Sequence, residues 1–293
     1  MKPAPSIVAN IEVRARDILI SFARWREKEK SHAFVVSSQK KLVAILLICF
    51  FQPQPSFGTA AVIITVNKGI IIAVDGSIKH TNSKGETTHY TSECKISKQG
   101  SVFYIPVGPR NLPSLGYNIF DITNKAIIKS RSIRDIFGFI EPPILTEIPS
   151  IVHYIQVTNP SDYRAMLKGE PVVSVAFATL EDNKPIAAFV EFHVDSEGRP
   201  MKPGEKIVAE VPPGGTSLAA MGSSAEINAA TADHEWWGRF HSNPIGESEH
   251  LIQLEIDAST RKGNHDVGPP ISILFISQDL TGTVPGHEGA CHY

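Results

Sequence analysis

Cysteine is scarce in this sequence, with only Cys49, Cys94 and Cys291 among 293 residues. No two of them are spaced as CxxC, and none forms the paired cysteine and histidine spacing of a structural zinc site. A small scaffold held by several disulfides is therefore excluded.

A metal-binding motif is also missing. His234 and His241 stand near Glu235, but their spacing is not HExxH, and nothing nearby in the sequence supplies a third ligand. We therefore expect no metal, and no other cofactor motif is present.

An excess of charge of one sign is absent, since the formal net charge is −2 and charged residues make up 20% of the chain. Such a chain has no general electrostatic attraction for nucleic acid or for an anionic membrane. Hydrophobic residues reach 42%, the composition of an ordinary globular protein with a sizeable core. Nucleic acid is not an expected partner.

Long hydrophobic runs are missing as well. The most apolar stretch, LVAILLICFF at residues 42–51, is ten residues long, whereas a membrane-spanning helix needs about 20. A stable membrane span is therefore not expected.

The stretch at residues 40–58 has the order of a secretory signal. Lys40 and Lys41 precede the apolar run, and the polar segment QPQPSFG comes after it. Ser56 and Gly58 fit the small-x-small cleavage pattern, which puts the cut between Gly58 and Thr59. The sequence predicts an exported protein, periplasmic or extracellular, whose mature chain begins at Thr59.

Residues 1–39 make an unusually long region ahead of that signal. One explanation is a translation start near residues 35–36. The alternative is that residues 11–26 form a basic amphipathic helix and residues 42–51 pack as a buried segment. In that case the protein is cytoplasmic.

The rest of the chain alternates β-rich runs with two helical patterns. Residues 60–66 and 69–74 predict a hairpin, with further strands at 101–107, 172–180, 185–194 and 271–276. Residues 115–134 and 248–262 have helical spacing, and Pro142-Pro143 is expected to break the chain segment after the first of these helices. This grouping predicts an α+β domain at 59–282 with sheets between helix layers, preceded by the extension 1–58 and followed by a loose tail at 283–293.

Three residues in this pattern could carry out nucleophilic chemistry. If the hairpin folds back near residues 67–68, Asp75 comes close to Thr59, and a neighbouring strand could add Lys95. An N-terminal threonine carries its own base, because its α-amino group has a pKa of about 7.7–8.0. A lysine ammonium would favour charge on Oγ, and an aspartate would orient the lysine.

The order of these residues resembles the proteasome β subunits and their simpler bacterial relatives. It runs Gly-Thr, a hairpin ending in Val-Asp-Gly-Ser, then Lys-Ile, then a strand ending in Val-Gly. The resemblance implies a four-layer αββα sandwich of the N-terminal-nucleophile hydrolases, with Thr59 as nucleophile, Asp75 and Lys95 assisting, and the N–H of Gly108 in the oxyanion hole. The turn around Ser223 resembles the family's glycine-serine turn and makes Ser223 a supporting residue.

The sequence departs from the family pattern in two places. The loop between Asp75 and Lys95 is a few residues longer than usual, so Lys95 is assigned by its Lys-Ile context. Near the C-terminus the family has a supporting aspartate and serine. Here Val267 stands in the place of the serine, and either Asn264 or Asp266 serves for the aspartate, of which Asp266 is our choice.

These features predict an exported threonine hydrolase that cleaves peptide or amide bonds through an acyl-enzyme. Two alternatives remain open: a non-catalytic shell or binding subunit with the same fold, and a small-molecule amidase of the same group. The expected partners are a peptide or amide substrate and, by the resemblance, further copies of the chain. Lys79, Lys84 and Lys98 are expected to be bystanders.

Overall fold

The computed structural model describes residues 58–66, 68–81, 87–207, 216–263, 265–289 and 291. All of them belong to one unit of the fold. The predicted signal segment, apart from Gly58, lies outside the described residues, as do the predicted helix at 11–26 and the candidate Asn264.

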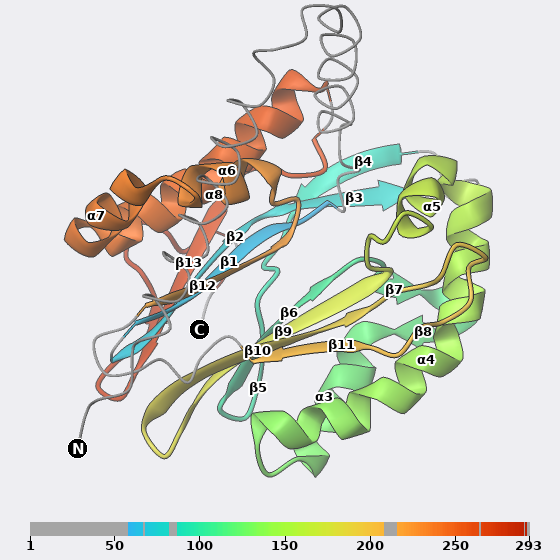
Figure 1. Cartoon of the computed structure of the whole chain (residues 1–293), viewed down its shortest axis with the longest axis horizontal. Helices are drawn as coiled ribbons and strands as arrows, with labels where there is room; N and C mark the ends of the chain where they lie inside the picture. The colour runs from blue at the N-terminus through green and yellow to red at the C-terminus, as the bar shows by residue number, and fades with distance from the viewer. Residues whose placement is uncertain are drawn as a thin grey trace, which may run out of the picture. The chain divides into compact units, whose positions relative to one another are not determined.

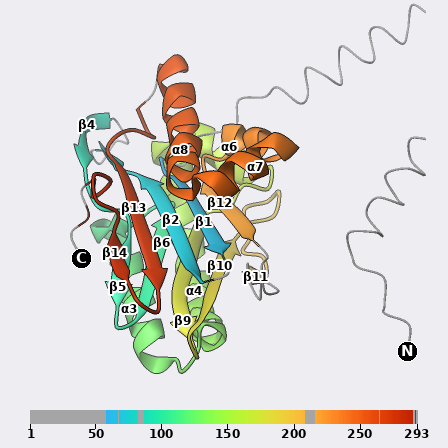
Figure 2. The same cartoon turned by 90° about the vertical axis from the view of Figure 1, so that its left-hand side faces the viewer.

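The first of two five-stranded sheets carries the start of the described chain. Its strand order is β12-β1-β2-β13-β14, and each neighbouring pair is antiparallel, as can be followed in Figure 2. The β1–β2 register pairs Ala61 with Val74, which brings the residue before β1 to the end of β2. The strands are β1 (Ala60–Val66), β2 (Gly69–Asp75), β12 (Ser217–Gly222), β13 (Ile271–Ser277) and β14 (Thr281–Thr283).

The second sheet has the order β11-β10-β9-β6-β5, also antiparallel throughout. One hydrophobic cluster joins the two sheets, with Ile63 and Ile72 from the first and Ile105 and Ala176 from the second. The strands are β5 (Ser97–Gln99), β6 (Val102–Val107), β9 (Val173–Glu181), β10 (Lys184–Phe192) and β11 (Gly204–Ile207).

Helices cover the outer face of each sheet (Figure 1). One cluster packs α3 and α4 against the second sheet, and another packs α6, α7 and α8 against the first. Because both faces of each sheet are covered, β1 and β2 are apolar at almost every position. The helices are α3 (Ile119–Lys129), α4 (Ile133–Thr158), α5 (Pro160–Met166), α6 (Ala225–Thr231), α7 (His234–Ser242) and α8 (Pro244–Arg261).

The expected mixture of helix and sheet is confirmed, including the second helix, predicted at 248–262 and found as α8. None of the helices in the described ranges is long and apolar enough to cross a membrane. The first predicted helix, at 115–134, is shorter than expected. Residues 111–118 form two short strands, β7 (Asn111–Leu112) and β8 (Tyr117–Asn118), around a 3-10 turn, η2 (Pro113–Leu115), and Asn118 then caps α3.

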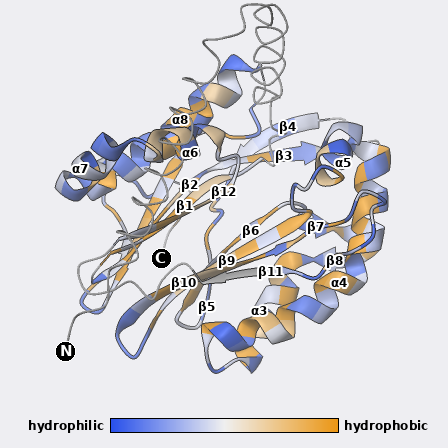
Figure 3. Cartoon of the chain, in the orientation of Figure 1, coloured by the Kyte–Doolittle hydropathy of each residue, from blue (hydrophilic) through white to orange (hydrophobic). Residues whose placement is uncertain are grey.

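The predicted break at Pro142-Pro143 is wrong, because α4 continues through both prolines and through Pro149. A proline inside a helix costs about 3 kcal/mol. Here the helix buries a row of isoleucines at intervals of three and four residues, which offsets that cost: Ile133, Ile136, Ile140, Ile144, Ile148, Ile151 and Ile155. Figure 3 shows hydrophobic and hydrophilic colours alternating along α3 and α4.

The polar loop expected after Asp75 is partly a hairpin. Strands β3 (Ser77–Thr81) and β4 (Thr87–Ser92) pair antiparallel and form a separate two-stranded sheet. Lys95 comes after this hairpin in a segment without regular structure, which ends where β5 begins.

The expectation of a loose tail from residue 283 is wrong for the described residues. Strand β14 ends at Thr283, the Val284 N–H donates to the Ile273 carbonyl at 2.9 Å, and the Ile273 N–H donates to the His287 carbonyl at 2.8 Å. Cys291 is buried and forms a disulfide with Cys94, 197 residues away. The sequence excluded a disulfide-rich scaffold but did not indicate this single bond.

Candidate active site

Thr59 lies immediately before β1 and is almost fully buried, with 3% of its surface exposed. Its Oγ1 donates a hydrogen bond to the Gly58 carbonyl oxygen at 2.9 Å. The hydroxyl is therefore next to the peptide bond that joins Thr59 to the preceding chain.

Asp75 ends β2 and has no exposed surface. Its carboxylate accepts three backbone hydrogen bonds, from Ala60 N at 2.7 Å, Ser77 N at 3.2 Å and Gly268 N at 3.1 Å. The first of these results directly from the β1–β2 pairing, as the sequence predicted. The bond from Gly268 comes from a distant part of the chain and fixes the carboxylate from a second side.

Lys95 brings the elements of the site together. Its Nζ donates to both Asp75 oxygens at 2.9 Å, to the Gly58 carbonyl oxygen at 2.6 Å and to Thr59 Oγ1 at 3.3 Å. The lysine is 1% exposed, so water contributes little to its solvation. The three residues predicted to act together thus form one buried hydrogen-bonded group.

Burial shifts both ionisable groups of this cluster. Desolvation raises the pKa of Asp75 above its usual value, although Lys95 and the backbone donors act in the opposite direction. Desolvation lowers the pKa of Lys95 to about 8, against the attraction of Asp75. At neutral pH the lysine therefore still carries its proton, but it holds it less firmly than an exposed lysine.

Gly222 and Gly108 both stand at positions where a Cβ would meet backbone atoms, and only Gly222 would meet those of Thr59. Gly222 has a φ of 71°, and a Cβ there would lie 2.0 Å from the Thr59 carbonyl oxygen and 3.3 Å from a methyl group of Val107. Gly108 is the residue after Val107 and has a φ of 101°, and a Cβ there would lie 2.5 Å from the Val172 carbonyl oxygen. Gly108, predicted for the oxyanion hole, thus comes directly after β6, and its neighbour Val107 lies close to Gly222.

Ser223 contacts Thr59 through its backbone, because its N–H donates to the Thr59 carbonyl at 2.7 Å. Its hydroxyl points elsewhere and donates to Glu255 Oε2 at 3.0 Å. Buried Glu255 also accepts from the N–H groups of Glu226 and Ile227 at the start of α6. Nothing in the sequence indicated this role for Glu255, because the residue lies in the middle of an amphipathic helix.

Asp266 lies at the edge of the site and is held by the β3–β4 hairpin. Its Oδ1 accepts from Tyr90 OH at 3.2 Å and forms an ion pair with Lys79 at 3.3 Å. Lys79, expected to be a bystander, is thus part of this region. Val267, where a serine was sought, is buried in the core beneath α8.

Arg110 is a further residue of this region that the sequence did not single out. It stands two positions after Gly108, and its charge contributes to the low pKa of Lys95. A single arginine after Gly-Pro belongs to no recognisable motif, so the sequence alone could not identify Arg110 as a residue of this region.

No family model matches this sequence, and no curated protein matches it. Solved structures of Anbu from Hyphomicrobium sp. strain MC1, one of them a Gly-1 mutant, have a TM-score of 0.38 at 15% and 14% identity, and each match covers 77% of this chain and 84% of that one. Anbu from Yersinia bercovieri, described as an ancestral beta-subunit, has a TM-score of 0.39 at 12% identity over 77% and 86% of the two chains. Similarity at this level assigns neither a family nor an activity.

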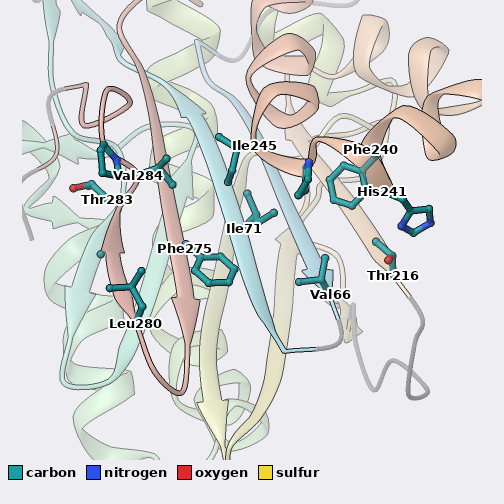
Figure 4. A pocket seen from close by; sticks show the side chains of 13 residues that line it. Val66, Ile71, Thr216, Phe240, His241, Ile245, Phe275, Leu280, Thr283 and Val284 are labelled. Atoms are coloured by element: carbon teal, nitrogen blue, oxygen red, sulfur yellow. The ribbon is translucent and has the colours of Figure 1, made fainter.

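A separate apolar pocket of about 580 Å³ lies on the helix-covered face of the first sheet (Figure 4). Val66, Ile71 and Phe275 line it from the strands, and Phe240 and Ile245 from the helices. Val66 is at the opposite end of β1 from Thr59, about 20 Å away for a strand of this length. The pocket is therefore distinct from the candidate active site.

The described residues contain no group of three or more histidine, cysteine or acidic side chains that could hold a metal ion. His234 and His241, considered above, lie on α7, with their side chains exposed.

Proposed function

We propose that this chain is an N-terminal-nucleophile hydrolase with the αββα sandwich of that group, and that Thr59 attacks an amide or peptide carbonyl. The observation that carries the proposal is the position of Lys95 Nζ, within hydrogen-bond distance of Thr59 Oγ1, both Asp75 oxygens and the Gly58 carbonyl. Three sequence-distant groups that each suit nucleophilic chemistry are buried together, which a purely structural threonine does not require.

In the mature enzyme the freed α-amino group of Thr59 accepts the hydroxyl proton as Oγ attacks the substrate carbonyl. Lys95 stabilises negative charge on Oγ, and Asp75 keeps Lys95 oriented. The backbone N–H of Gly108 is proposed to bind the oxyanion, a contribution of typically about 2.7–4 kcal/mol. The α-amino group passes this proton to the substrate nitrogen, so the amine half of the substrate leaves. Water then hydrolyses the ester and releases the acyl half from Oγ.

Removal of residues 1–58 is proposed to use the same groups. Lys95 donates to the Gly58 carbonyl, which polarises the carbon that Thr59 Oγ1 would attack. Attack forms an ester between Gly58 and Oγ1 and breaks the Gly58–Thr59 amide, whose nitrogen takes the hydroxyl proton. Water then hydrolyses the ester and restores the hydroxyl. Cleavage by signal peptidase at the same bond is the competing route.

Export is part of the proposal. Disulfides persist in oxidising compartments and are rare in the cytosol of most organisms. The Cys94–Cys291 bond supports a periplasmic or extracellular location. It is independent of the signal-like segment at 40–58.

A non-catalytic shell subunit is the second candidate. Val267 provides no hydroxyl, the Ser223 hydroxyl is bonded to Glu255, and the Asp266 carboxylate is bonded to Tyr90 and Lys79. Among the described residues, which do not include Asn264, Thr59 thus lacks the additional polar support that the resemblance implies. A small-molecule amidase differs from the leading proposal only in its substrate, and a panel of peptides and acylamides separates the two.

The deciding experiment concerns Thr59 itself. The protein purified from its own host should begin at Thr59 by intact mass, and Thr59→Ala should abolish labelling by a threonine-directed electrophile. Thr59→Ser should keep part of the activity, because serine retains the hydroxyl and the adjacent amine. Thr65→Ala is the matched control, since Thr65 is buried on the same strand and its hydroxyl has no partner.

The Thr59→Ala variant also separates the two routes of maturation. It stays uncleaved if Thr59 cuts its own peptide bond, and it is still trimmed if signal peptidase makes the cut. A folded, exported wild-type protein that begins upstream of Thr59 would exclude catalysis and leave the shell subunit.

A further inference from the structure

A disulfide lies directly beside the lysine of the candidate active site. Cys94 precedes Lys95 in the chain, and its partner is Cys291, 197 residues away. Residues 93–96 lie between β4 and β5 and have no regular structure, so strand pairing does not hold the Lys95 backbone. The disulfide is therefore a covalent restraint on the segment that carries Lys95.

The other end of this disulfide is fixed on β13. The Ile273 N–H donates to the His287 carbonyl at 2.8 Å. A Cβ at Gly289 would lie 2.2 Å from Ser272 Oγ, so the backbone at Gly289 lies against the start of β13. Cys291 itself has no exposed surface. Hydrogen bonds and packing thus hold this end of the chain in place.

The same strand also fixes the partner of Lys95. Strand β13 pairs with β2, and Ile271 is opposite Asp75 in that register. Asp75 is thus attached to β13 by strand pairing, and the segment of Lys95 is attached to it through Cys291. The lysine and the carboxylate that it contacts at 2.9 Å are therefore held relative to one strand.

The contact between Lys95 and Thr59 is sensitive to small movements of that segment. Lys95 Nζ lies 3.3 Å from Thr59 Oγ1, which is longer than most hydrogen bonds, so a shift of about 1 Å would break the contact. The Glu93 N–H also holds the segment, by a bond of 2.9 Å to the Gly76 carbonyl, and Ile96 is buried in the core. These noncovalent contacts flank Cys94 on both sides, whereas the disulfide restrains the residue next to Lys95 itself.

We propose that the Cys94–Cys291 disulfide positions Lys95 beside Thr59, so that the site is fully active only while this bond is formed. The inference rests on the proposed function and adds a form of regulation to the same site. Cys94 is partly exposed, so a dithiol can form a mixed disulfide with it and release Cys291 as a thiol. The second sulfur of the dithiol then frees Cys94. Two cysteines are thereby reduced, and the dithiol is oxidised to a disulfide.

The test compares the oxidised and reduced forms of the mature protein well below the unfolding temperature. Reduction should lower the rate at which a threonine-directed electrophile labels Thr59 by about 10- to 100-fold, the effect of a misplacement near 1 Å, and reoxidation should restore it. Cys291→Ser should react at the reduced rate with or without the dithiol. Peptide mapping assigns the label to Thr59 rather than to a freed cysteine. Equal rates in the two forms would overturn the proposal.

Two further variants separate positioning from a loss of stability. Ile140→Ala removes a buried side chain of α4 and should destabilise the fold about as much as loss of the disulfide, yet it should keep the labelling rate. Lys95→Met combined with Cys291→Ser should react no more slowly than Lys95→Met alone, because the disulfide acts through the lysine. Independent losses that multiply in the double variant would contradict this.

A measurement on Lys95 itself separates this inference from the proposed catalysis. In Thr59→Ala protein, methylation of the Lys95 amine by formaldehyde and cyanoborohydride should be about tenfold faster after reduction, because the amine reaches water more often. Exposed Lys98 is the internal control and should react alike in both forms.

The two readouts fail in different ways. If methylation of Lys95 rises on reduction while no form of the protein with Thr59 is labelled, the disulfide positions Lys95 and the hydrolase proposal fails. If both forms label Thr59 equally and Lys95 is methylated equally, the hydrolase stands and the disulfide does not position its lysine.

Discussion

Lys95 and Asp75 are buried charges, and burial sets both their chemistry and their cost. Each is at most 1% exposed, and the pair is joined by two hydrogen bonds of 2.9 Å. Removal of one partner from such a pair leaves the other charge uncompensated, at a cost of about 3–5 kcal/mol. The activity of variants at these positions must therefore be normalised to the amount of folded protein.

Lys95→Met and Asp75→Asn should each lower the rate of acyl transfer by about 100-fold or more. The first removes the cation beside the nucleophile, and the second removes the charge that orients this cation. Electrophile labelling of Thr59 well below the unfolding temperature measures this. Lys98→Ala is the control, since Lys98 is exposed and lies over the ring of Phe103, and it should leave the rate unchanged. Near-normal rates in Lys95→Met would remove Lys95 from the mechanism.

The low pKa of Lys95 predicts a pH-dependent stability. Between about pH 8 and the ordinary lysine value of 10.5, the unfolded chain binds a proton at Lys95 that the folded chain has lost. The contribution of Lys95 to the free energy of unfolding therefore rises with pH across that window, by up to about 3 kcal/mol. Urea unfolding of the uncleaved chain at pH 7.5 and pH 10 should show this rise relative to Lys95→Met, which lacks the titrating amine. An equal pH dependence in both proteins would contradict it.

At the level of elements, the end of β12 fixes the position of Thr59. Gly222 pairs with Ala60, and the Ser223 N–H holds the Thr59 carbonyl. Any side chain at Gly222 would meet the Thr59 backbone rather than a flexible group.

Gly222→Ala should therefore displace Thr59, abolish labelling of its hydroxyl and destabilise the fold by more than about 3 kcal/mol. Gly116→Ala isolates the effect of backbone conformation, because Gly116 has a similar φ of 67° but a Cβ there would meet no atom within 4 Å. That control should cost only about 1–2 kcal/mol and keep activity. Urea unfolding measures the loss of stability, and electrophile labelling measures the loss of activity. Full activity in Gly222→Ala would show that β1 and β12 can move apart at this point without displacing Thr59.

At the level of the whole molecule, the Cys94–Cys291 bond ties the C-terminus to the residue next to Lys95. Loss of a native disulfide typically costs about 2–5 kcal/mol. Cys94→Ser, Cys291→Ser and the double variant should each lose about this amount, because all three remove the same bond. Denaturant unfolding with and without a dithiol measures this, and the dithiol should destabilise only the wild type. Additive losses in the double variant would mean that the bond does not form.

The sequence alone determined the parts of the site that depend on neighbouring strands. Residues 60–66 and 69–74 are apolar throughout because both faces of their sheet are covered, so the hairpin was readable and placed Asp75 beside Thr59. The same local patterns predicted strands β1, β2, β6, β9, β10 and β13 and helices α3 and α8, but not α4 to α7. The Lys-Ile context was enough to choose Lys95. The number of residues between Asp75 and Lys95 was not, because that loop is longer than the usual family spacing.

Only the tertiary structure decided the features that need distant parts of the chain. The burial of isoleucines along α4 outweighed its prolines, and the β3–β4 hairpin brought Lys79 and Tyr90 to Asp266. The Ser223 hydroxyl turned to Glu255, and Cys291 reached Cys94 across the fold. Local propensity cannot specify such contacts, because each is set by the burial of groups that are far apart in the sequence and meet only when the layers pack.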